Sequence, residues 1–182
     1  MRLLATIGAL AIIAIIAGAA YFFGGYYDVA ATASEPAWVS SALARVRQAS
    51  IARHATATPP VSMTEPAVIQ SGARAFGERG CTTCHGAPGV EWAKFSEGLR
   101  PDPPDLKDIG PKVPPEQLFA AIKSGIRMTG MPSFALAGVG DPEIWTITAF
   151  VKNFDKVSEA DFKAWTAAGS QSGGAPAKPP GG

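Results

Sequence analysis

The longest apolar segment lies at the start of the chain, where residues 3–23 contain no charged side chain. At 1.5 Å per residue, a helix of this length measures about 30 Å, the thickness of the hydrocarbon core of a bilayer. An aromatic belt suited to the membrane interface follows at Tyr21, Phe22, Phe23, Tyr26 and Tyr27. The alternative is a cleaved signal peptide, but its apolar region is usually only about 7 to 15 residues long. The pattern predicts an uncleaved single-pass transmembrane anchor in residues 1–27.

The pattern over residues 34–55 predicts a second helix, with Ser34 as its N-cap and Glu35 and Pro36 in its first turn. Apolar residues recur at helical spacing and arginines supply positive charge; these residues are Val39, Leu43 and Val46, and Arg45, Arg47 and Arg53. A helix lying on an anionic membrane surface and a docking helix both fit this pattern. We assign residues 28–62 to a linker that contains this amphipathic helix, ending in a segment rich in Pro and Thr.

Helical periodicity returns in three stretches between residues 63 and 168. The first opens at Thr64, Glu65 and Pro66. Its expected inner face carries Val68, Ile69, Ala73 and Phe76. The second runs over 115–125 and ends at a glycine, which tolerates positive φ. The third begins with Asp141 as cap and Pro142 at the first helical position, and its apolar stripe contains Ile144, Trp145, Thr148 and Val151.

The pattern over the rest of the chain predicts loops and two short helical turns. Residues 81–114 are dense in Gly, Pro and Asp and predict mostly loop, with a turn near Trp92 and Phe95, and a further short turn is expected at 159–165. No run alternates with period two, so we expect no sheet and assign residues 63–168 to an all-α domain. Residues 169–182 are polar and rich in Gly and Pro, which predicts a flexible tail.

Charge excludes one class of partner. The stretch from 63 to 168 carries nearly equal numbers of basic and acidic side chains, so it has no electrostatic support for nucleic-acid binding.

Both cysteines of the chain lie within five residues that also contain a histidine: Cys81, Cys84 and His85. This C-x-x-C-H pattern is the signature of c-type haem attachment. Two thiols three residues apart can each add to one vinyl group of a porphyrin, and the next residue then supplies its imidazole to the iron. We therefore predict one covalent haem c, bound by the two cysteines and His85.

Three other interpretations of the motif are weaker. A thioredoxin-like redox pair requires a βαβ setting, which the pattern does not predict. A structural zinc site needs four ligands, and only the distant His54 could join the set. A disulfide between the two cysteines would leave His85 without a role.

Over about residues 64–166 the chain resembles the class I cytochromes c, and among them the monohaem, membrane-anchored kind. The resemblance rests on C-T-T-C-H at 81–85, on Gly72 and Phe76 in the preceding helix, on T-G-M-P at 129–132 and on Trp145 in the closing helix. It implies an all-helical fold around one haem, in which the first and last helices cross at the small Gly72. It also implies that a proline carbonyl accepts a hydrogen bond from His85, for which Pro103 and Pro104 are the first choices and Pro88 the next.

Met131 is the expected sixth ligand of the iron. It lies between Gly130 and Pro132, and the proline favours an extended backbone at Met131, beyond the end of the third predicted helix. Met128, Met63 and His54 remain as alternatives. The haem should also complete the core by packing against apolar side chains, for which the candidates are Phe76, Phe119, Ile122, Phe134, Trp145 and Phe150.

A Met/His-ligated iron has no open position, so the expected function is electron transfer between Fe(II) and Fe(III) rather than catalysis. The expected partners are membrane redox complexes, such as a quinol-oxidising complex, a terminal oxidase or a dehydrogenase of a respiratory chain. Two alternatives remain: a fixed cytochrome c subunit of a dehydrogenase or oxidase complex, and a five-coordinate gas sensor or peroxidase. The resemblance, together with Arg2 on the inner side of the anchor, implies a bacterial inner membrane with the haem domain in the periplasm.

Overall fold

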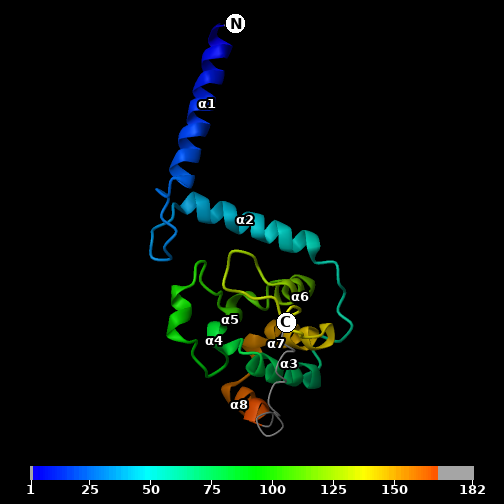
Figure 1. The fold of residues 1–182 in the computed structure, drawn as a ribbon. Coiled ribbons are helices and arrows are strands. Elements are labelled where there is room, and N and C mark those ends of the chain that lie inside the picture. The colour runs from blue at the N-terminus through cyan, green and yellow to red at the C-terminus, as the bar shows by residue number, and fades with distance from the viewer. Residues whose placement is uncertain (1, 168–182) are drawn as a thin grey trace, which may run out of the picture. The chain divides into compact units, whose positions relative to one another are not determined.

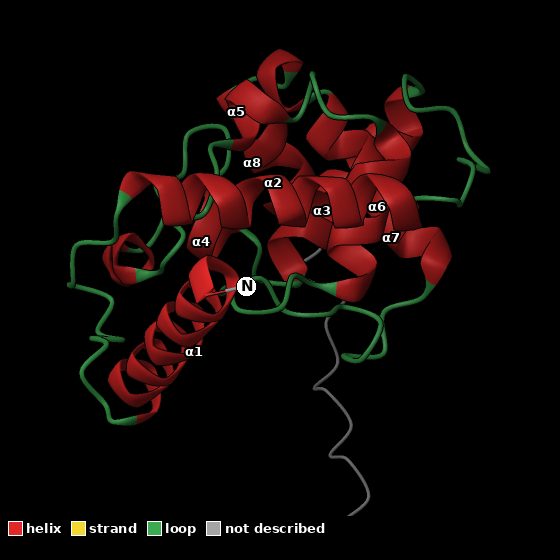
Figure 2. Ribbon diagram, turned by 90° about the horizontal axis from the view of Figure 1, so that it is seen from above, coloured by secondary structure: helices red, strands yellow, loops and turns green. Residues whose placement is uncertain are grey.

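The computed structural model describes residues 2–167, and over this range the chain forms helices and loops without a strand (Figures 1 and 2). One isolated bridge joins Ala87 and Val90. The all-α prediction is therefore confirmed, while the predicted tail at 169–182 lies outside the described residues. The chain divides into two compact units, Met1–Pro36 and a second that begins at Ala37.

The first unit contains α1 (Arg2–Phe23), an apolar helix without a buried residue. Within residues 2–167 it is the one helix that is long and apolar enough to cross a membrane. At its end the aromatic rings stack on each other, with centroid distances of 6.2 Å for Tyr21 and Tyr26 and 5.1 Å for Phe22 and Tyr27. The sequence between Leu3 and Phe23 is thus compatible with a membrane anchor.

The second unit begins with α2 (Ala37–His54), which packs against α6 (Pro115–Ser124). The predicted N-cap at Ser34 is wrong, because the helix starts three residues later, directly after Pro36. A proline has no N–H and a fixed φ, so it is well suited to the entry of a helix. No residue of α2 is fully buried, and the side chains of Trp38 and Val46 are 75% and 67% exposed.

The core forms where α3 (Pro66–Glu78) crosses α7 (Asp141–Lys152). Gly72 lies at the crossing, and a Cβ atom built on it would meet the carbonyl oxygen of Thr146 at 1.9 Å. The two backbones can approach this closely only because residue 72 has no side chain, as the resemblance implied. Phe76 of α3 and Phe150 of α7 pack beside the crossing with ring centroids 5.1 Å apart.

Two further helices cover this pair. Helix α6 packs on α7, where the rings of Phe119 and Trp145 stack at 4.0 Å between centroids. Helix α8 (Glu159–Ala167) packs on α3 and places Phe162 against Phe150. The side chains expected to line the haem pocket, Phe76, Phe119, Ile122, Phe134, Trp145 and Phe150, are all buried in this core.

Short helices interrupt the long loop, namely α4 (Thr82–His85), η1 (Lys94–Gly98) and α5 (Leu106–Ile109), and η2 (Phe154–Lys156) follows α7. The turn expected near Phe95 corresponds to η1. Helix α5 was not predicted, and Asp105 caps it by accepting a 2.8 Å hydrogen bond from the backbone N–H of Lys107. Lys152 fastens the segment after α5 by donating to the carbonyls of Pro111 and Val113 at 2.7 and 2.8 Å.

The cap predicted for the third helix differs in detail. Helix α7 begins at Asp141 itself and Gly140 takes the cap position, so Asp141 makes no capping hydrogen bond. Its carboxylate instead accepts from the Lys123 ammonium at 2.7 Å. This contact ties the start of α7 to the last turn of α6.

Candidate haem site

The C-x-x-C-H motif forms one tight helical turn. Cys81 directly precedes α4, and the backbone N–H of His85 donates to its carbonyl at 3.0 Å. Gly80 and Gly86 bracket the turn with φ of 75° and 64°, the left-handed region that glycine enters without strain. The turn therefore presents two thiols and one imidazole from five consecutive residues.

His85 is held by the carbonyl of Pro104, 3.1 Å from its Nδ1. Because a carbonyl oxygen can only accept, Nδ1 must carry the proton, and in a neutral ring Nε2 then keeps its lone pair. Burial lowers the pKa of His85, and the hydrogen bond to Pro104 opposes this only in part. The ring is therefore neutral, oriented and able to bind a metal through Nε2. Of the three prolines considered from the sequence, Pro104 makes this contact.

The two cysteines are free thiols and half-buried. Burial raises the pKa of the Cys81 thiol to about 12. Redox-active and metal-binding cysteines usually have a lowered pKa, so this environment argues against a thioredoxin-like pair. Among residues 2–167, no three His, Cys, Asp or Glu side chains come together as a metal site, which argues against structural zinc. His54 is exposed on α2, where its ring nitrogen lies 2.8 Å from the carbonyl of Ser50.

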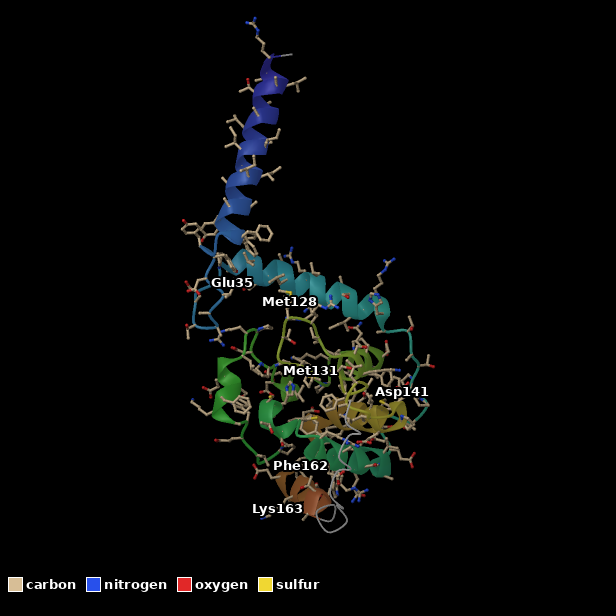
Figure 3. The ribbon with its side chains drawn as sticks, viewed as in Figure 1. Glu35, Met128, Met131, Asp141, Phe162 and Lys163 are labelled. Carbon is tan, nitrogen blue, oxygen red and sulfur yellow. The ribbon has the colours of Figure 1, made fainter. Side chains whose placement is uncertain are left out.

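The methionines differ in their surroundings. Met131 is half-buried and packs against the same hydrophobic core as Cys81, although the two residues are 50 positions apart. Met128 lies on the same loop (Figure 3), and its side chain is 84% exposed. Met63 packs against the core, and its backbone carbonyl accepts a hydrogen bond from Nδ2 of Asn153 at 2.7 Å. Of the methionines considered, Met131 is the one on the loop between α6 and α7 that reaches the interior.

Sequence reasoning missed the groups that shape this loop. The hydroxyl of Thr129 accepts a hydrogen bond from the backbone N–H of Met131 at 3.1 Å. Gly130 packs closely against the side chain of Leu99, whose Cδ1 would lie 2.8 Å from a Cβ at position 130. The threonine two positions before the methionine was visible in the sequence. The hydrogen bond of its hydroxyl, however, depends on the backbone geometry of the loop, which the pattern of apolar residues does not indicate.

These residues fit a c-type haem: two free thiols three positions apart, a neutral imidazole with a fixed tautomer, and a thioether on a loop that packs against the same core. The family described as cytochrome c oxidase, cbb3-type, subunit III matches residues 67–151. Comparison with curated proteins found no match. Comparison with solved structures found none either. Residues 67–151 are therefore a class I c-type cytochrome domain, with covalently bound haem c as cofactor and electron transfer as its role.

Proposed function

We propose that this protein is a membrane-tethered electron carrier in which Cys81 and Cys84 attach the haem and His85 and Met131 ligate its iron. The observation that carries the proposal is the hydrogen bond from Nδ1 of His85 to the carbonyl of Pro104, which fixes the tautomer of the ring and leaves the lone pair of Nε2 available to bind a metal. When bound, haem c supplies a reversible one-electron couple between Fe(III) and Fe(II).

The chain contributes the binding of the haem and the orientation of its ligands. Cys81 and Cys84 fix the porphyrin edge, and His85 supplies a neutral nitrogen ligand. Met131 supplies a thioether, which favours the ferrous state and raises the reduction potential. An iron held by His85 and Met131 together would leave no open position for oxygen or peroxide, so the domain would pass electrons and perform no chemistry on a bound substrate.

Helix α1 is the proposed anchor, and residues 1–27 with their aromatic rings hold the protein in a bacterial inner membrane. Because α2 packs on α6, only residues 24–36 separate the apolar helix from the second unit. Thirteen residues span at most about 45 Å when extended. Such a tether confines the domain to the periplasmic surface of the membrane and raises its effective concentration near membrane partners of a respiratory chain.

A second candidate function is that of a fixed subunit in an oxidase or dehydrogenase complex. The family description, which names a subunit of a cbb3-type cytochrome c oxidase, favours it. In both cases the proposed partners are membrane redox complexes. The two functions differ in whether the chain leaves its partner.

Solubilisation of native membranes in a mild detergent separates these functions. The carrier proposal predicts that the haem-stained chain elutes on size exclusion at the size of one chain plus its detergent micelle. The measurement is made on the full chain, with the detergent micelle alone as size reference. Elution in a stoichiometric complex that persists at moderate salt would contradict the mobile carrier and support the fixed subunit.

A further inference from the structure

The loop that carries Met131 is closed by contacts between its two ends. We call residues 125–132 the strap. The backbone N–H of Ile126 donates to the carbonyl of Met131 at 3.1 Å. Gly125 has φ of 66°, and a Cβ at this position would come within 2.9 Å of the Met131 carbonyl oxygen. The strap is therefore a narrow loop whose first and last residues touch.

One side chain bonds across the inside of this loop. The Thr129 hydroxyl donates to the carbonyl of Ile126 at 2.7 Å and accepts from the backbone N–H of Met131 at 3.1 Å. It thus uses its donor and an acceptor at once, linking the residue at the start of the strap to the methionine near its end. Thr129 itself is half-buried.

The strap also contains a strained residue. Met128 has φ of 61°, the one non-glycine residue among residues 2–167 with a positive φ. A residue other than Gly, Asn or Asp in this conformation costs about 1 to 2 kcal/mol, so the surrounding contacts must hold it. The Thr129 hydroxyl bonds to Ile126, two positions before Met128, and to Met131, three positions after it. These two hydrogen bonds can hold Met128 in its strained conformation.

We infer that Thr129 is a positioning residue whose hydroxyl keeps the Met131 sulfur on the haem iron, an inference that rests on the proposed function of Met131. Without the hydroxyl, the Met131 N–H and the Ile126 carbonyl lose a partner, and the strap opens more often. Met131 then leaves the iron more often, although the ligand itself is unchanged.

The test compares Thr129→Val with Thr129→Ser in the full haem-loaded chain. Valine keeps the β-branched shape and removes the hydroxyl, whereas serine keeps the hydroxyl. The readout is the rate at which saturating carbon monoxide binds the ferrous protein, because carbon monoxide must wait for Met131 to leave. Loss of one or two hydrogen bonds predicts that Thr129→Val binds about 5 to 30 times faster, while Thr129→Ser stays near the wild-type rate.

Two controls make the outcomes separable. Thr166→Val removes a hydroxyl that donates to the Phe162 carbonyl at 2.8 Å on α8, and should leave the carbon monoxide rate unchanged. Met131→Ala gives the rate without a sulfur ligand. If Met131→Ala binds no faster than the wild type, the proposed ligand is wrong. If Met131→Ala is fast but Thr129→Val matches the wild type, or Thr129→Ser is as fast as Thr129→Val, the role of the Thr129 hydroxyl is overturned while the ligand stands.

Discussion

Replacement of Gly72 by alanine should destabilise the domain by about 3 kcal/mol or more. The new methyl group would clash with backbone atoms, which cannot move aside as a flexible side chain can. The new Cβ would lie 1.9 Å from the Thr146 carbonyl oxygen and 2.5 Å from its carbon, so α3 and α7 must separate. With about 4 to 8 °C per kcal/mol for a domain of this size, the melting temperature should fall by more than about 10 °C. Thermal unfolding followed by circular dichroism measures this.

Gly77→Ala is the matched control on the same helix. A Cβ at Gly77 would meet only the methyl carbon of Thr166 at 3.4 Å, an ordinary contact. Since alanine favours a helix over glycine by up to about 1 kcal/mol, this variant should melt at or above the wild-type temperature. Equal melting of Gly72→Ala and Gly77→Ala would show that α3 and α7 do not cross at residue 72.

Replacement of both Cys81 and Cys84 by serine should remove the covalent link to the haem and with it most of the folded domain. A single domain is stabilised by only about 5 to 15 kcal/mol, and a tightly bound group contributes to that stability by binding only the folded chain. The double variant should therefore show little pigment after acid–acetone extraction and little helical signal from the second unit. Absorption and circular dichroism of the purified chain report both.

The single variants provide the graded control. Cys81→Ser and Cys84→Ser each leave one thiol, and the chain has no other cysteine. Each single variant should retain pigment on the polypeptide through one thioether, at lower yield than the wild type. Pigment that stays attached in the double variant would mean that these thiols are not the attachment points.

The helices of the domain could be predicted from the sequence because their apolar residues recur at helical spacing. Helices α3, α6 and α7 follow such stripes, and Pro66, Gly125 and Pro142 mark their ends. The motif at 81–85 led to the proposed haem attachment site, because its two thiols and its imidazole have the spacing that covalent attachment of a porphyrin requires. The close crossing at Gly72 came from the family resemblance, since a single glycine in a helix does not reveal its neighbour.

Other features depended on contacts that periodicity does not report. Helix α5 is four residues long, too short to show a repeat, and it depends on the side chain of Asp105. Asp141 was predicted to cap α7, but an ion pair with Lys123 holds its carboxylate instead. The bonds made by Thr129 involve backbone groups, which carry no residue-specific signal in the sequence.

The ferric absorption spectrum of the full chain, compared with that of Met131→Ala, tests the account most directly. The account predicts a low-spin spectrum with the long-wavelength sulfur-to-iron band at neutral pH, and loss of that band in Met131→Ala. A high-spin spectrum that Met131→Ala leaves unchanged would contradict it, and would point to a five-coordinate iron of the kind found in gas sensors and peroxidases.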